Sequence, residues 1–258
     1  MDKKAIIRNF SRYADTYDRY CAVQRQAALA LLEMTGENNI NKILELGCGT
    51  GNYTYFLRER FPDSAIKAID ISREMIQVAA KKIKDERIEF ILGDAETIDL
   101  GESFDLVTSN ACFQWLEDLQ AALAKYKKLL KENGFILFSV FGPRTFWELN
   151  MSVRSLFKNI SITADNFVAK ERLEDILNQD FKEVEIKETA FQESFFCLSD
   201  MLNKIKHSGI NGSGIGRKFL FTPRILKRLE EIYLNKFSCT DTKQMNATYQ
   251  VFFCRGVK

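Results

Sequence analysis

The sequence predicts an α/β fold built on a mostly parallel sheet with helices packed around it. Short apolar runs alternate with segments of helical periodicity over residues 40–141, which is the rhythm of consecutive βαβ units. The first of these runs leads directly into a glycine-rich turn, and two later runs are followed by an aspartate. The 258 residues show no internal repeat and no linker, so we expect a single domain with helical insertions.

Residues 2–34 are predicted to be helical, within an N-terminal helical cap of residues 1–36. Apolar residues recur there at steps of three and four, which places them on one face of a helix; they are Ile6, Phe10, Tyr13, Tyr17 and Cys21. A short turn at Gly36–Asn39 separates the cap from the core.

The core, residues 40–141, is predicted to hold five strands with helices between them. The strands are Lys42–Leu46, Ala65–Ile69, Ile88–Leu92, Phe104–Thr108 and Phe135–Phe141. The helices are Tyr53–Arg60, Arg73–Lys84 and Leu116–Lys131. Asn133-Gly134 follows the last of these helices and is expected to cap its C-terminus.

Residues 142–258 follow a different rhythm and are assigned to the substrate side of the domain, with a lid and the final strands. Helices are predicted at Thr145–Asn159 and Lys170–Gln179, and a strand of alternating pattern at Glu183–Phe191. A basic, glycine-containing stretch comes next. Thr222-Pro223 then begins another helix, with the threonine as its cap, and the chain closes on a strand at Thr248–Cys254.

Composition excludes several classes of protein. The longest apolar runs are too short for a membrane-spanning helix, and the first residues lack the apolar stretch of a signal peptide, so we expect a cytoplasmic protein without a membrane partner. A net charge of +2 argues against a nucleic-acid partner. The six cysteines are scattered and His207 is the single histidine, which favours reduced thiols over a metal site or disulfides.

The segment Ile43–Gly51 joins a buried strand to the glycine-rich turn. Glycine lets the backbone turn sharply and approach a ligand, because no Cβ intervenes. The helix N-terminus beyond the turn supplies N–H donors for an anionic group. The spacing here is G-x-G-x-G, which differs from the dinucleotide fingerprint G-x-G-x-x-G, and the G-K-[ST] of a Walker loop is absent.

Acidic residues follow the second and third strands. Asp70 ends the second strand, the usual place for a carboxylate that binds a ribose diol. Asp94, within Gly93-Asp94-Ala95, follows the third strand, where it could meet an adenine amine. Either acid could instead be a simple helix cap. The agreement of the glycine turn, the spacing and both acids favours a ligand site at this edge of the sheet.

Residues 40–141 thereby resemble the class I S-adenosylmethionine-dependent methyltransferases. The resemblance implies a Rossmann-like, mostly parallel seven-stranded sheet with an antiparallel last strand. It also implies that Gly47, Gly49 and Gly51 approach the methionyl part of the cofactor, Asp70 the ribose and Asp94 the adenine. The other cofactor-binding residues that we expect are Tyr13, Gln24, Glu45, Cys48, Ile71, Met75, Ala95 and Asn110.

Further segments resemble one family, the malonyl-acyl-carrier-protein O-methyltransferases of biotin synthesis. They are Phe10 with Tyr17-Asp18 and Gln24, Ser109-Asn110 through Phe113-Gln114-Trp115-Leu116, Phe141–Thr145 with Glu148-Leu149, Ile205–Gly209 with Asn211, and Ala247-Thr248-Tyr249. The stretch after the fourth strand is not the D/N-P-P-Y/F of amide- and base-nitrogen methyltransferases. His207 is a departure that leaves the chemistry of the lid open.

The resemblance implies methyl transfer to the free carboxylate of a malonyl thioester, carried by an acyl carrier protein or by CoA. Such a carboxylate is ionised near neutrality, with a pKa of about 4, so no general base is needed. Catalysis would depend on positioning and on the removal of water. Tyr17 and Arg144 are the expected catalytic residues. The expected substrate-binding residues are Phe113, Trp115, Lys206 and Asn211.

Several of the residues singled out above could instead have a purely structural role. Tyr13 and Tyr17 could complete the apolar stripe of their helix, and Phe113 and Trp115 could be core residues. Arg144 and His207 could be ordinary loop residues. Two other functions stay open: a methyltransferase acting on a free organic acid or quinone precursor, and a non-catalytic S-adenosylmethionine-binding protein.

A basic stretch suggests how a carrier protein is recognised. Between Asp200 and Glu230 the sequence has no acidic residue but seven lysines and arginines. Two of them, Arg224 and Lys227, fall at a helix start, where cations oppose the macrodipole. Acyl carrier proteins are acidic, so complementary charge would steer docking. The docking candidates are Arg217, Lys218, Arg224, Lys227 and Arg228, with Lys125, Lys127 and Lys128 as a lesser group and a solvated basic face as the alternative.

Overall fold

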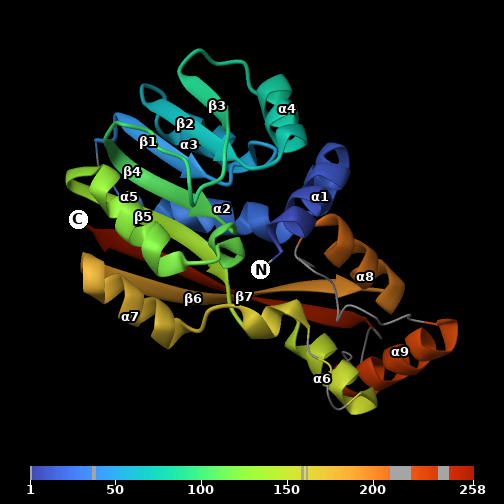
Figure 1. Cartoon of the computed structure of the whole chain (residues 1–258). Coiled ribbons are helices and arrows are strands. Elements are labelled where there is room, and N and C mark those ends of the chain that lie inside the picture. The colour runs from blue at the N-terminus through green and yellow to red at the C-terminus, as the bar shows by residue number, and fades with distance from the viewer. Residues whose placement is uncertain (1, 37–38, 158–159, 161, 210–221, 238–243) are drawn as a thin grey trace.

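The computed structural model describes residues 2–36, 39–157, 160, 162–209, 222–237 and 244–258. Within them, seven strands form one sheet in the order β3-β2-β1-β4-β5-β7-β6 (Figure 1). The first five strands run parallel, and β7 runs antiparallel to its neighbours β5 and β6. The predicted mostly parallel sheet with an antiparallel last strand is therefore confirmed.

The strands keep close to their predicted positions. Their bounds are β1 Lys42–Leu46, β2 Ala65–Asp70, β3 Ile88–Leu92, β4 Phe104–Asn110, β5 Leu130–Phe141, β6 Lys182–Phe195 and β7 Met245–Val257. The central strands β1, β4 and β5 are almost wholly buried, since helices cover both faces of the sheet. Apolar clusters lie on both sides of this layer. Because β1 to β4 run parallel, their carboxyl ends lie at the same edge of the sheet.

Three helices connect the parallel strands, namely α3 (Asn52–Arg60), α4 (Arg73–Lys82) and α5 (Leu119–Leu129). The prediction for α5 was wrong at both ends. A 3₁₀ turn, η2 (Phe113–Trp115), precedes it, and α5 itself begins after Asp118, which accepts a hydrogen bond from the Ala121 N–H at 2.9 Å.

Asn133-Gly134 does not cap a helix but lies inside β5. A Cβ on Gly134 would come within 3.0 to 3.1 Å of three carbonyl oxygens, two of them on β4. The pairing of β4 with β5 is irregular just here. Glycine is required because the two backbones approach closely at this irregularity, a role that its position after a helical pattern does not reveal.

The N-terminal cap is not one continuous helix, as predicted, but three pieces: α1 (Lys3–Tyr13), the 3₁₀ helix η1 (Ala14–Arg19) and α2 (Ala22–Glu33). The break has a tertiary cause. Asp18 in η1 accepts hydrogen bonds from Thr50 Oγ1 and Asn52 Nδ2 beside the glycine turn, and pairs with Lys82 at 2.7 Å. These bonds draw η1 onto the core and end the regular helix.

The C-terminal part contributes α6 (Trp147–Leu156), η3 (Thr163–Asn166), α7 (Lys170–Asp180), α8 (Leu198–His207) and α9 (Pro223–Phe237). Figure 1 shows α7 beside β6, and α8 and α9 near the far end of the β6–β7 pair. The start of α9 agrees with the prediction, since the Ile225 N–H donates to Thr222 Oγ1. The helix α8 was not predicted; its residues were assigned to an irregular basic stretch.

In the described part of the chain, no helix is both long and apolar enough to cross a bilayer.

Candidate active site

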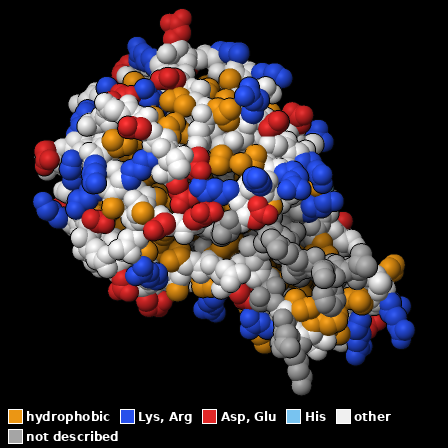
Figure 2. Space-filling view, viewed as in Figure 1, with side chains coloured by type: hydrophobic (Ala, Val, Ile, Leu, Met, Phe, Trp, Pro, Cys, Tyr) orange, Lys and Arg blue, Asp and Glu red, His pale blue; other side chains and the backbone are white. Residues whose placement is uncertain are grey.

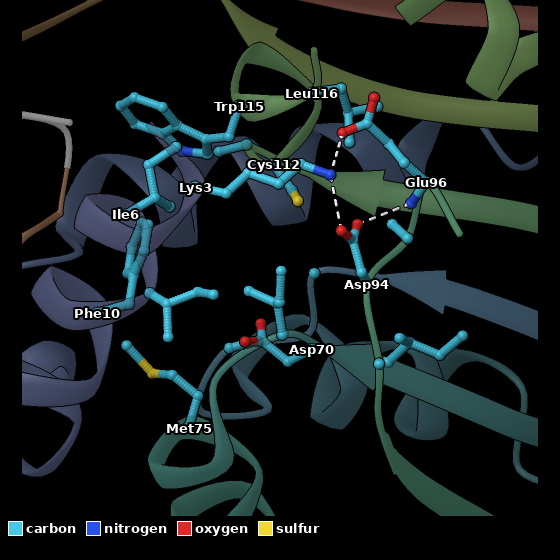
Figure 3. Close-up of a pocket in the computed structure, with 18 of the residues that line it drawn as sticks. Lys3, Ile6, Phe10, Asp70, Met75, Asp94, Glu96, Cys112, Trp115 and Leu116 are labelled. Carbon is cyan, nitrogen blue, oxygen red and sulfur yellow. Dashed lines mark hydrogen bonds and ion pairs between the residues drawn. The ribbon is translucent and has the colours of Figure 1, made fainter. Parts of the chain in front are cut away.

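A cavity lies at the carboxyl edge of the sheet, between α1 and the ends of β1 to β4. Figure 3 shows its two sides. Ile6 and Phe10 of α1 stand with Trp115 on one side, and the carboxylates of Asp70 and Asp94 lie on the other. An apolar wall facing fixed acceptors suits a ligand with a flat ring and a few polar groups.

The three glycines of the turn have positive φ angles of 71°, 55° and 81°, which favour glycine. Their surroundings differ. A Cβ on Gly47 would meet Cys112 Sγ at 2.3 Å, and one on Gly51 would press on Ala79 and Ile83 at 3.1 Å, so both are close-packed. A Cβ on Gly49 would meet no atom within 4 Å. Gly49 therefore offers the open stretch of backbone against which a ligand can lie.

Asp70 fixes the turn from the end of β2. Its Oδ2 accepts a hydrogen bond from the Gly49 N–H at 2.9 Å, and its Oδ1 accepts one from the Ser72 N–H at 2.8 Å. Burial raises the pKa of Asp70, while these backbone donors oppose the shift. A carboxylate oxygen can accept two hydrogen bonds, so Asp70 keeps capacity for hydroxyl groups of a ligand.

Asp94 is paired with a residue of the cap. Lys3 Nζ lies 2.7 Å from Asp94 Oδ2 and 2.6 Å from Glu96 Oε2. Burial alone would raise the pKa of both acids, but the pairing with Lys3 holds the pKa of each below its usual range. Both carboxylates are therefore ionised acceptors at neutral pH.

A smaller cavity continues from the glycine turn toward α2, and Tyr17 and Asn110 line both cavities. Asn110 is held by two bonds, since its Nδ2 donates to the Gln24 carbonyl at 2.9 Å and its Oδ1 accepts from Ser139 Oγ at 2.7 Å. Burial raises the pKa of Tyr17 well above its usual value. Its hydroxyl therefore stays protonated and can donate a hydrogen bond.

Most of the predicted cofactor-binding residues come together at these two cavities, as do Tyr17 and Trp115. They are Tyr17, Gln24, Gly47, Cys48, Gly49, Asp70, Ile71, Met75, Asp94, Ala95, Asn110 and Trp115. Gly51 shapes the turn without lining either cavity.

Other predicted residues lie elsewhere. The Tyr13 ring packs on His207, with ring centroids 4.4 Å apart. Glu45 is buried within β1, where burial raises its pKa to about 8. Phe113 is a core residue that packs on Phe138. Arg144 is exposed at the end of β5, and its backbone N–H donates to Gln250 Oε1.

Of the residues expected at the lid and the docking surface, Lys206 is exposed on α8, and Arg224, Lys227 and Arg228 are exposed on α9. Asn211, Arg217 and Lys218 lie outside the described residues. Among the described residues, no cluster of His, Cys, Asp and Glu is arranged to hold a metal ion.

Comparison with known proteins identifies the family. A family model described as "Methyltransferase domain" matches residues 44–138. Malonyl-acyl-carrier-protein O-methyltransferase 2 of Ilyobacter polytropus is 35% identical over 94% of this chain and 93% of its own length. The enzyme of that name from Bacillus cereus is 34% identical over 100% of this chain and 98% of its own.

The chain belongs to the malonyl-acyl-carrier-protein O-methyltransferase family.

The fold of this methyltransferase agrees with solved structures. The YcgJ protein of Bacillus subtilis, 16% identical, covers 90% of this chain with 98% of its own length at a TM-score of 0.60. At that identity the likeness concerns the fold alone. The expectation of a class I S-adenosylmethionine-dependent methyltransferase is thus confirmed for both fold and enzyme class.

Sequence reasoning missed several cavity residues of the methyltransferase. Ile7, Glu96, Cys112 and Leu116 line the larger cavity and Arg25 the smaller one. Cys112 and Leu116 flank Phe113-Gln114-Trp115, and that run is the signal in the sequence for both. Lys3 carried no signal, because it lies 91 residues before the aspartate that it contacts.

Proposed function

We propose that this methyltransferase transfers a methyl group from S-adenosylmethionine to the free carboxylate of malonyl-acyl carrier protein. The product is the methyl ester that starts pimeloyl formation in biotin synthesis. One observation carries the proposal: a chain of this family brings Gly49, Asp70 and Asp94 to a single cavity. The names of the relatives indicate the methyl acceptor, and the cavity offers a binding site for the methyl donor.

The residues present fit S-adenosylmethionine. Gly49 leaves open space above its backbone, as a cradle for a ligand requires. Asp70 would accept hydrogen bonds from the ribose hydroxyls, and Asp94 one from the adenine amine. Ile71 and Met75 line the same cavity and would give the adenine ring apolar neighbours.

The methionyl end of the donor would lie toward the smaller cavity. Gln24, Cys48 and Asn110 line that cavity beside the glycine turn. Arg25 lines it as well, and its guanidinium lies 5.5 Å from the centre of the Phe56 ring. We assign Arg25 to the methionyl carboxylate, because a guanidinium is suited to bind a carboxylate through paired N–H donors.

S-adenosylmethionine, when bound, supplies an electrophilic methyl group on its sulfonium. The protein then has no proton to remove, because the malonyl carboxylate is already ionised, with a pKa of about 4. Tyr17 lines both cavities and its hydroxyl is protonated, so it could donate a hydrogen bond to the carboxylate and orient it. Phe10 and Trp115, whose rings meet edge to face at 6.3 Å, exclude water from the same space.

Two exposed cations would draw the anionic substrate toward the cavity. Arg144 follows β5 and Lys206 stands on α8, neither of them a lining residue. Their contribution would be to the encounter rather than to chemistry.

The carrier protein would dock on the basic face of α9. Figure 2 shows Lys and Arg side chains over this helix beside apolar ones. Arg224 and Lys227 are exposed at its start, and Arg228 pairs with Glu231 at 3.0 Å. Two lysines of the lesser docking group already have partners within the protein. Lys125 donates to the carbonyls of Ala95 and Glu96, and Lys127 pairs with Asp180. Malonyl-CoA, which lacks the carrier surface, would be the poorer acceptor.

The test is incubation with methyl-labelled S-adenosylmethionine and one acceptor at a time. Label should pass to malonyl-carrier protein, and far less to free malonate or to a quinone precursor. Transfer to a free small molecule with none to malonyl-carrier would favour the rival small-molecule methyltransferase. Binding of the donor without transfer to any acceptor would favour a non-catalytic protein.

A further inference from the structure

The first turn of α1 reaches across the larger cavity to the loop that follows β3. Lys3 is the first residue of α1, and its ammonium lies between the carboxylates of Asp94 and Glu96, at 2.7 and 2.6 Å. Figure 3 shows the lysine side chain extended toward both. All three side chains line the cavity and are largely shielded, with exposures of 26%, 24% and 14%.

The two carboxylates are held from their own side of the cavity. Asp94 Oδ1 accepts a hydrogen bond from the Glu96 N–H at 2.9 Å. Glu96 Oε1 accepts bonds from the N–H groups of Glu117 and Asp118 at 3.0 and 2.9 Å. The Lys3 ammonium, in contrast, is carried by a flexible four-carbon side chain on the first residue of α1. A rearrangement of this cluster would therefore move the lysine and leave the carboxylates in place.

In the proposed function, the Asp94 carboxylate also accepts a hydrogen bond from the adenine amine. Its Oδ2 is already paired with Lys3. Glu96 gives the ammonium another partner within reach, so Lys3 can release Asp94 without becoming an unpaired charge. Because partly exposed ion pairs are individually weak, the exchange of Asp94 for Glu96 as the partner of Lys3 needs little free energy.

We propose that Lys3 is a positioning residue that latches α1 over the adenine end of the cavity. When the donor binds, the Lys3 ammonium moves away from Asp94 and stays paired with Glu96. Asp94 can then accept a hydrogen bond from the adenine amine, while α1 stays in place. Ile6, Ile7 and Phe10 of the same helix line the cavity, so the latch also keeps its apolar wall closed. This inference rests on the proposed function.

The experiment compares Lys3→Met with Lys4→Met. Lys4 is the next residue of α1, carries the same charge and is exposed away from the cavity lining. The probe is S-adenosylhomocysteine, and the measurement is its dissociation rate. Lys3→Met should release it about three to five times faster, the size expected for a partly buried ion pair, and Lys4→Met at the wild-type rate. Lys3→Arg, which keeps the positive charge, should release S-adenosylhomocysteine at close to the wild-type rate.

Three further measurements distinguish a latch from a general loss of structure. Glu96→Gln should speed release as Lys3→Met does, and the double variant should add nothing, because both remove one interaction. The difference between wild type and Lys3→Met should shrink at about 0.5 M salt. Equal melting temperatures of the two methionine variants would show that α1 remains folded in both.

Three outcomes would overturn the inference. Tighter binding by Lys3→Met would mean that the ammonium competes with adenine. Equal release by Lys3→Met and Lys4→Met would mean that Lys3 has no part, and the donor site itself would still stand. Absence of S-adenosylhomocysteine binding by the wild type would remove the proposed donor site and the latch together.

Discussion

The Asp70 carboxylate accepts a hydrogen bond from the backbone N–H of Gly49 at 2.9 Å. This bond joins the end of β2 to the glycine turn after β1, so one contact fixes both the proposed ribose acceptor and the open backbone proposed for the methionyl chain. The second oxygen binds the Ser72 N–H, which leaves the carboxylate little freedom to rotate. Contacts within the protein therefore hold the proposed donor site in place.

Gly49→Ala should abolish donor binding while the protein remains folded. The new methyl group would occupy the open space where we place the ligand. The positive φ of 55° adds strain of about 1–2 kcal/mol. Gly101→Ala is the matched control, since Gly101 has φ 59° and also has no atom within 4 Å of a built Cβ.

The two variants should lose similar stability by thermal denaturation. Titration calorimetry with S-adenosylhomocysteine should detect no binding to Gly49→Ala and wild-type binding to Gly101→Ala. Wild-type affinity in Gly49→Ala would place the ligand elsewhere.

Tyr17→Phe should lower kcat about tenfold or more with malonyl-carrier, because one hydrogen bond to the carboxylate is lost in a shielded site. The affinity for S-adenosylhomocysteine should change little. Tyr20→Phe is the control, as Tyr20 stacks on His207 at 4.6 Å and lines neither cavity. Because burial raises the pKa of Tyr17 well above its usual value, the wild-type rate should show no loss from its ionisation between about pH 7 and 9. Unchanged kcat in Tyr17→Phe would leave the residue a packing role only.

Asp18→Asn should lower stability at neutral pH and have no effect in acid. Burial raises the pKa of Asp18, but its bonds to Lys82 and Thr50 outweigh this and lower it. A carboxyl with a lowered folded-state pKa stabilises the fold above about pH 4, and this contribution is lost as pH falls through the folded value.

Since Asp18 is 44% exposed, the difference at pH 7 should be only about 0.5–1 kcal/mol. Melting curves from pH 7 to 3 should converge for wild type and Asp18→Asn. Asp15→Asn, an exposed change in the same turn, should match wild type throughout. A constant difference across this range would mean that the carboxylate charge is not what holds η1 to the core.

Charge reversal of Arg224, Lys227 and Arg228 to Glu should raise KM for malonyl-carrier about tenfold, because like charge then opposes docking. KM for malonyl-CoA should stay within about twofold, as CoA does not need the carrier surface. Reversal of Lys127 and Lys128 tests the lesser docking group in the same assay. Equal effects on both acceptors would remove α9 as the docking site.

Local patterns predicted the part of the site that depends on strands and their ends. Apolar runs bounded by turn residues gave β1 and β3 with the bounds observed. Because parallel strands end at a common edge, the sequence positions of Asp70 and Asp94 were enough to bring them to one cavity.

Contacts between distant residues account for what was missed. Asp18 breaks the N-terminal helix through residues 32 and 64 positions away, so the apolar stripe alone gave no sign of it. Gly134 matches a helix cap in sequence but meets a neighbouring strand in space. The helix α8 was not predicted from its basic composition, although Leu198, Met201 and Ile205 are buried at helical spacing.

The location of the transferred methyl group tests the central claim most directly. After reaction with S-adenosylmethionine, the phosphopantetheine arm of malonyl-carrier is released and fragmented in a mass spectrometer. The account predicts one added methyl group on the terminal carboxylate, removable by mild alkaline ester hydrolysis. An added methyl group that resists hydrolysis, as on the central malonyl carbon, or no added mass at all, would contradict it.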